Sequence, residues 1–168
     1  GLVKREVVRV VTPGTNTSEQ SLSTDKNNYL MSVAYCPDRI GMSFVDITTG
    51  DYYLTELGSL NELIDEINKF SPAEIICNEA FLVSGIDVTC LRDRLKIVIN
   101  AQPPHIYDEE RCKNAILKHF KVLSVMGLGI ADFPLGIVAS GALLQYLHDT
   151  QKQDLKHITH IYPYLAST

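Results

Sequence analysis

The chain has 168 residues, of which 45% are hydrophobic and 21% are charged, and its formal net charge is −5. A chain of about 150 residues buries roughly 70% of the surface that its unfolded form exposes, so one domain of this size folds without disulfides or a structural metal. The composition argues against intrinsic disorder, and the apolar stretches are too short to span a membrane, so a soluble, folded protein is expected.

The distribution of charge and of cysteine excludes further classes. Net acidity without a run of Lys and Arg argues against an autonomous nucleic-acid binder, which concentrates positive charge against phosphates. The cysteines form no C-x-x-C pair, which argues against a zinc site and favours a reduced, cytoplasmic protein: Cys36, Cys77, Cys90 and Cys112. Residues 1–9 lack the apolar core of a signal peptide, and the missing initiator Met indicates an excerpt of a longer chain.

The first part of the chain predicts a strand, a loop and an antiparallel meander. Residues 2–11 alternate apolar and charged side chains as a strand does, a Pro-Gly turn follows, and residues 16–28 read as a polar surface loop. Three runs rich in β-branched and aromatic residues, joined by short turns, then predict antiparallel strands over 29–36, 40–47 and 52–57.

Helical periodicity replaces the strand pattern after residue 57. Ser59 and Glu62 form the capping box S-x-x-E, and apolar residues recur at helical spacing as far as Phe70. Two short apolar runs, 73–77 and 96–100, predict buried strands, and a short helix with irregular flanks lies between them at 80–94. Because β-α-β crossovers are right-handed and parallel, the sequence predicts a mixed five-stranded α/β sheet flanked by helices.

Two further helices are expected in the last third. Asp108 is a candidate N-cap for a helix to about residue 121, and Pro134 fits the first turn of a helix over about 133–152. The second helix carries small residues that allow close approach to the sheet: Gly136, Ala139, Ser140, Gly141 and Ala142.

Enzyme signatures are mostly missing from the sequence. It contains no G-x-x-x-x-G-K-[ST] loop and no G-x-G-x-x-G motif, and Gly127-Leu-Gly129 is too short a fragment to indicate a phosphate site. His157 and His160 are three apart, but no third metal ligand lies near them in sequence. His105, His119 and His148 stand alone without a nucleophile motif, and Cys77 is expected in the core.

An antiparallel meander followed by two crossovers is the outline of an RNase H-like fold, whose nucleases hold two metal ions with clustered carboxylates. The sequence therefore leaves a metal-dependent nuclease open as an alternative function. Its candidate ligands are Asp46, Asp51, Glu56, Glu79 and Asp108. Each also has an ordinary structural explanation, such as capping at the Thr-Thr-Gly turn between Asp46 and Asp51, and we expect the five to be dispersed.

Several segments occur in a recognisable order over nearly the whole chain: LVKREVVRVVTPGT (2–15), NNYL (27–30), IGMSFVDITTGDYYLTEL (40–57), SPAEII (71–76) and GIVASGALLQYLHDTQKQDLKHI (136–158). This order resembles the DNA mismatch repair MutS family. The resemblance implies a connector domain of RNase H-like fold at 29–153. It also implies the end of a mismatch-binding domain and a linker at 1–15, a polar loop at 16–28, and a linker toward the core and lever region at 154–168.

The resemblance also implies what this part of the family protein does. The family's Phe-x-Glu mismatch wedge and its Walker ATPase are not in this sequence, so neither catalysis nor a bound cofactor is expected of the fragment. The full-length family protein binds ATP with Mg²⁺ and mismatched DNA through other domains and forms a homodimer. The connector relays between neighbouring MutS domains and docks a MutL-type partner.

The helix expected at 108–121 offers a candidate surface for such a partner. With Cys112, Ala115, Ile116, His119 and Phe120 on its inner face, its outward residues are Arg111, Lys113, Asn114 and Lys118. A merely solvated helix face is the competing explanation for each of them, since surface charges are ordinary.

Overall fold

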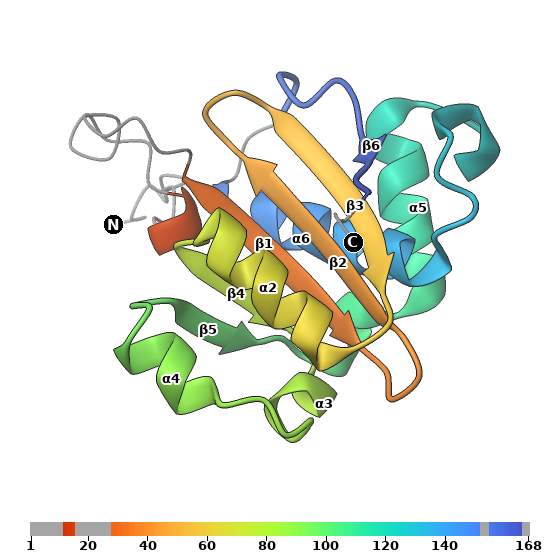
Figure 1. Cartoon of the computed structure of the whole chain (residues 1–168). Helices are drawn as coiled ribbons and strands as arrows, with labels where there is room; N and C mark the ends of the chain where they lie inside the picture. The colour runs from red at the N-terminus through yellow and green to blue at the C-terminus, as the bar shows by residue number, and fades with distance from the viewer. Residues whose placement is uncertain (1–11, 16–27, 152–154, 166–168) are drawn as a thin grey trace, which may run out of the picture.

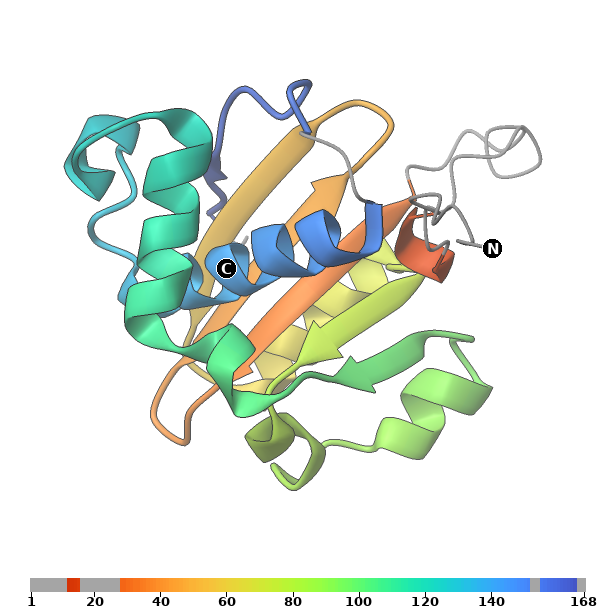
Figure 2. The same cartoon turned by 180° about the vertical axis from the view of Figure 1, so that it is seen from behind.

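The computed structural model describes residues 12–15, 28–151 and 155–165. A single twisted sheet forms the middle layer, with helices on both of its faces (Figure 1). Helices α2 (Leu60–Phe70), α3 (Glu79–Leu82) and α4 (Val88–Asp93) cover one face. Helices α5 (Glu109–Phe120) and α6 (Pro134–Gln151) cover the other, as the view from behind shows (Figure 2). The strand expected at 2–11 and most of the loop expected at 16–28 lie outside the described residues.

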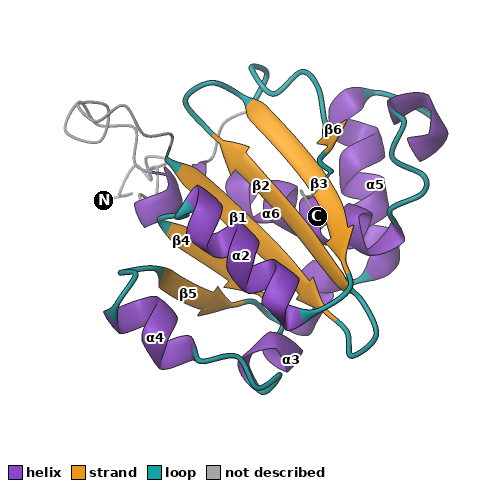
Figure 3. Cartoon of the chain, viewed as in Figure 1, coloured by secondary structure: helices purple, strands orange, loops and turns teal. Residues whose placement is uncertain are grey.

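The sheet has the order β5-β4-β1-β2-β3-β6. Its antiparallel meander consists of β1 (Tyr29–Tyr35), β2 (Ile40–Asp46) and β3 (Asp51–Leu57). On the other side of β1, β4 (Glu74–Cys77) pairs parallel with β1, and β5 (Val98–Ala101) pairs parallel with β4. The meander and the two crossovers are therefore confirmed, and this order of strands is RNase H-like (Figure 3).

The predicted number of five strands is wrong, because the sheet has a sixth. Strand β6 (Tyr162–Pro163) pairs parallel with β3, where Tyr162 lies opposite Tyr53. The Tyr164 amide extends this contact by donating to the Leu54 carbonyl at 2.7 Å. A strand of two residues is too short to show alternation, so no pattern in the sequence indicates it.

Helix α2 begins as its capping box predicts. The Ser59 hydroxyl accepts from the Glu62 amide at 3.2 Å, and the Glu62 carboxylate accepts in turn from the Gly58 amide at 2.6 Å, one residue before the usual position. The expected short helix at 80–94 is two helices, α3 and α4. They are separated by Gly85, whose φ of +102° few other residues adopt, and Asp87 caps α4 through the Cys90 amide.

Helices α5 and α6 form the second layer as predicted. Asp108 caps α5 by accepting from the Arg111 amide at 3.0 Å. Gly136 of α6 lies directly on β3, since a Cβ there would be 3.0 Å from the Thr55 carbonyl. Gly141 instead faces α5, where a Cβ would be 2.3 Å from the Cys112 carbonyl. Short 3-10 turns complete the described chain: η1 (Pro13–Thr15), η2 (Pro104–Tyr107) and η3 (Val125–Leu128).

None of the helices in the described part of the chain is long and apolar enough to cross a membrane. Even α6, which is buried along most of its length, is covered by the sheet and by α5.

Candidate functional site

The five carboxylates considered as metal ligands do not converge. Asp46 and Asp51 lie opposite each other at one end of the β2-β3 hairpin, where Asp46 accepts from the amides of the turn, that of Thr48 at 2.9 Å. Glu56 lies toward the other end of β3 and caps α6 by accepting from the Leu135 amide at 2.6 Å. Within the described ranges, no three His, Cys, Asp or Glu side chains are placed to hold a metal ion. The expectation that these carboxylates are dispersed is confirmed.

The remaining two carboxylates begin helices, Glu79 at α3 and Asp108 at α5. The histidine pair near the C-terminus has structural contacts as well. The ring of His157 donates from Nε2 to the Ile47 carbonyl, and the ring of His160 stacks on Tyr162 at a centroid distance of 5.7 Å.

Glu74 is a buried acid that the sequence reading missed. It is fully buried in β4 and accepts three hydrogen bonds: from the Gly14 amide at 3.1 Å, from Asn100 Nδ2 at 2.7 Å and from the Tyr146 hydroxyl at 2.5 Å. Burial, and then the hydrogen bond to Glu74, raise the pKa of Tyr146. The sequence contains one signal for such a buried acid: an ionisable residue within the apolar run at 73–77, which must find hydrogen-bond donors when it is buried.

This carboxylate joins three parts of the molecule. Gly14 lies in η1, Asn100 in β5 and Tyr146 in α6, so the segment preceding the domain and its last helix share one buried acceptor. Gly14 fits closely, because a Cβ there would lie 2.8 Å from Leu30 Cδ1. If η1 or α6 moves relative to the sheet, its hydrogen bond to Glu74 must break, or Glu74 must move with it.

Two thiols lie in the core. Cys77 is fully buried, as predicted, and burial raises its pKa to about 12. Cys112 is buried where α5 meets η2, donates to the Ile106 carbonyl at 3.1 Å, and has its pKa raised by burial to about 12. Both are therefore protonated and unreactive at neutral pH.

Helix α5 presents the two faces that its periodicity predicts. Cys112 and Ile116 are buried, and Ala115, His119 and Phe120 are half-buried. The four residues proposed for partner binding are all exposed: Arg111, Lys113, Asn114 and Lys118. The structure divides them, because Arg111 and Lys118 line a groove and Lys113 and Asn114 do not.

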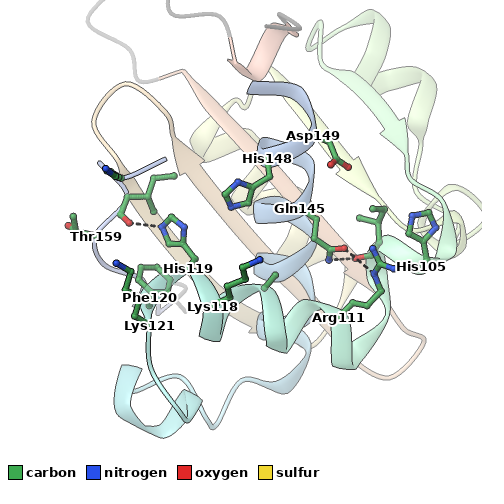
Figure 4. A pocket seen from close by; sticks show the side chains of 14 residues that line it. His105, Arg111, Lys118, His119, Phe120, Lys121, Gln145, His148, Asp149 and Thr159 are labelled. Carbon is green, nitrogen blue, oxygen red and sulfur yellow. Dashed lines mark hydrogen bonds between the residues drawn. The ribbon is translucent and has the colours of Figure 1, made fainter. Parts of the chain in front are cut away.

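The groove has a volume of about 740 Å³ and lies between α5, the C-terminal half of α6 and residues 156–159 (Figure 4). Four Lys and Arg side chains line it: Arg111, Lys118, Lys121 and Lys156. Three imidazoles also line it, His105, His119 and His148, whereas Asp149 is the one carboxylate among its described lining residues. The sequence does not indicate this basic cluster, because Lys156 is distant in sequence from the other three and only the fold brings it to the same groove.

Hydrogen bonds hold the walls of the groove in place. The Gln145 side-chain amide donates to the Ile106 carbonyl at 3.0 Å and accepts from Arg111 Nε at 3.5 Å, which links α6 to η2 and α5. At the opposite end, His119 Nε2 donates to the Ile158 carbonyl at 2.8 Å and fastens the 155–159 segment to α5 (Figure 4).

Comparison with protein families decides what kind of domain carries this groove. Residues 28–159 match the family described as MutS domain II. The chain belongs to the MutS family. Its similarity to individual MutS proteins covers more than the domain: it is 47% identical over 167 residues to the DNA mismatch repair protein MutS of Lachnoclostridium phytofermentans, which covers 99% of this chain and 18% of that protein.

Other relatives show the same relationship to MutS. The DNA mismatch repair protein MutS of Alkaliphilus metalliredigens is 40% identical, covering 98% of this chain and 19% of that protein, and the one of Halothermothrix orenii is 38% identical, covering 98% and 18%. The chain thus spans about a fifth of the length of the curated MutS proteins it matches. It corresponds to MutS domain II, the connector.

Among solved structures, T. thermophilus RuvC in complex with a Holliday junction substrate overlaps with a TM-score of 0.45 at 10% sequence identity, covering 74% of this chain and 98% of that chain. This domain is RNase H-like by the order and direction of its strands.

Proposed function

We propose that this chain is a non-catalytic connector of a MutS protein, relaying between neighbouring MutS domains and docking a MutL-type protein. The match to MutS domain II is the observation that carries this proposal. We extend it to the full-length protein, which would act in the cytoplasm as a homodimer that binds mismatched DNA and uses ATP and Mg²⁺ in its other domains.

The bonds of Glu74 support the relay. A displacement of the segment at Pro13–Thr15 reaches Glu74 through the Gly14 amide, and Glu74 is bonded to Tyr146 of α6. A packed core transmits such a displacement because it is not continuously deformable. In the full-length protein, Tyr146→Phe is expected to leave mismatch binding intact and to slow the ATP-dependent release of DNA, measured by stopped-flow fluorescence. Unchanged release would argue against this path.

Docking is supported by the exposed side of α5, which carries basic side chains although the chain as a whole has a net negative charge. The test is to immobilise this chain and titrate a MutL-type protein by biolayer interferometry, with the full-length MutS protein as the positive control. Saturable binding by the chain is expected. If the full-length protein binds and the chain does not, the docking role belongs to another domain.

The same preparation tests the competing nuclease. Mg²⁺- or Mn²⁺-dependent cleavage of duplex DNA or of an RNA–DNA hybrid, lost on Asp46→Asn, would replace the connector proposal with catalysis. We expect no cleavage, because the carboxylates that such a reaction needs are dispersed and used as caps.

A further inference from the structure

The groove behind α5 collects positive charge on an acidic chain. Four cationic side chains, Arg111, Lys118, Lys121 and Lys156, line it, and Asp149 is the one acid among the lining residues that the structure describes. The whole chain, in contrast, has a formal net charge of −5. The C-terminal end of α5 favours cations through its dipole, which accounts for Lys118 and Lys121. It does not account for Arg111, which lies in the first turn, or for Lys156, which comes from another segment.

The floor of the groove is apolar. Ile106 and Ile158 are buried beneath it, and Ala115 and Phe120 are half-buried in its wall. A concave apolar floor with a few polar groups at its rim is the usual form of a ligand site, and about 740 Å³ lies within the usual range of such sites.

The chemistry of the lining favours a peptide over a nucleic acid. Single-stranded nucleic acids bind by stacking bases on open aromatic faces. Phe120 lines the groove, but its ring stacks with Tyr52 at a centroid distance of 6.3 Å and meets His119 edge-on at 4.8 Å. Lys and Arg at the rim instead match carboxylates, and the apolar floor matches aliphatic side chains.

We propose that this groove binds an acidic peptide segment of the partner protein, with its carboxylates at Arg111, Lys118 and Lys156 and an apolar side chain over Ile158. This inference rests on the proposed docking function and adds the location and the chemistry of the segment that is bound. The walls are already fixed by Gln145 and His119, so little ordering of the groove is needed when the segment binds.

The test uses this chain and a fluorescein-labelled peptide of alternating glutamate and leucine, followed by fluorescence anisotropy. The matched probe has glutamine in place of glutamate, and unlabelled duplex DNA is the competitor. The variants are Lys118→Glu and Lys156→Glu, and the control is Lys113→Glu, which makes the same change on the same helix as Lys118 but outside the groove. Circular dichroism verifies that each variant is folded.

We expect the glutamate peptide to bind and the glutamine peptide not to bind. Each groove variant should weaken binding by about fivefold, and the Lys113→Glu control should stay within about twofold. Binding of the MutL-type protein should fall in parallel. Failure of the peptide to bind, equal binding by Lys118→Glu, or displacement of the peptide by duplex DNA at lower concentration would each overturn the proposal.

The partner titration separates this inference from the proposed docking function. If the MutL-type protein binds this chain and neither Lys118→Glu nor Lys156→Glu weakens it, docking stands and the groove is the wrong place. If the peptide binds the groove but the MutL-type protein does not bind the chain, the docking function fails, and with it the assignment of the segment to that partner.

Discussion

The hydroxyl of Tyr146 donates a 2.5 Å hydrogen bond to the carboxylate of Glu74, a residue 72 positions earlier in the chain. The pair crosses from α6 to β4, and both side chains are buried. A buried carboxylate is costly unless its oxygens are hydrogen-bonded, and Glu74 receives three donors from three elements. The domain therefore has a polar centre that fixes how its last helix and its preceding segment sit on the sheet.

Removing one donor should weaken this centre measurably. Tyr146→Phe leaves Glu74 buried with two donors, and we expect a loss of about 2 kcal/mol in the free energy of unfolding. Urea denaturation followed by circular dichroism measures it. The matched control is Tyr162→Phe, which deletes the same hydroxyl from a side chain that is 50% exposed and should cost less than about 0.5 kcal/mol. Equal losses for the two variants would show that the bond to Glu74 contributes nothing.

The close contact between α5 and α6 depends on Gly141. Alanine has the higher helix propensity, by about 1 kcal/mol, so Gly141→Ala would stabilise an isolated helix. Here the added Cβ would lie 2.3 Å from the Cys112 carbonyl, and backbone atoms must move apart. We expect a net loss of about 2 kcal/mol or more and a weaker MutL-type interaction, since α5 is displaced.

Gly127→Ala is the control for that substitution, because no atom outside its chain neighbours and the backbone of its own short helix lies within 4 Å of a Cβ at this position. It should change the unfolding midpoint little. A Gly141→Ala variant as stable as the parent would mean that the two helices separate without cost.

The Asp46 carboxylate should act as a turn cap and not as a metal ligand. Asp46→Ala removes the acceptor for the Thr48 amide and should cost about 1 kcal/mol in the free energy of unfolding, whereas Asp51→Ala, at an exposed position, should cost less. Thermal denaturation with and without Mg²⁺ checks both points. A rise in the melting temperature on adding Mg²⁺ that is lost in Asp46→Ala would contradict the assignment.

Buried thiols make the domain sensitive to alkali. The pKa values of Cys77 and Cys112 are raised from near 9 to about 12 by burial, so above pH 9 the unfolded chain loses protons that the folded chain keeps. Stability therefore falls as pH rises from the unfolded toward the folded pKa, by on the order of 1 kcal/mol for each thiol between about pH 9 and about pH 10. Urea midpoints across this range measure the loss, and a Cys77→Ala, Cys112→Ala double variant should show a shallower dependence than Cys36→Ser, whose thiol is exposed.

Local signals in the sequence predicted most of the fold. The capping box at Ser59, the cap at Asp108 and the apolar runs of β1 to β5 act over a few neighbouring residues, and all of them form. Two features were not predicted. Strand β6 is too short to show a period, and the break between α3 and α4 depends on the backbone conformation of a single residue, Gly85.

The candidate site was less predictable because it is assembled from distant parts of the chain. Helical periodicity placed Arg111 and Lys118 on the outside of α5, but nothing local indicates that Lys156 lies across from them. Glu74 lies within an apolar run that predicts only a buried strand, and its three donors come from segments far away in sequence. Contacts of this kind follow from the topology and not from propensity.

Hydrogen exchange with mass spectrometry, on this chain with and without the MutL-type protein, tests the central claim most directly. The account predicts slower exchange in α5 and in residues 155–159, with α2 on the opposite face of the sheet unchanged. Protection confined to α2 and the α3-α4 region, with α5 exchanging as in the free chain, would contradict it.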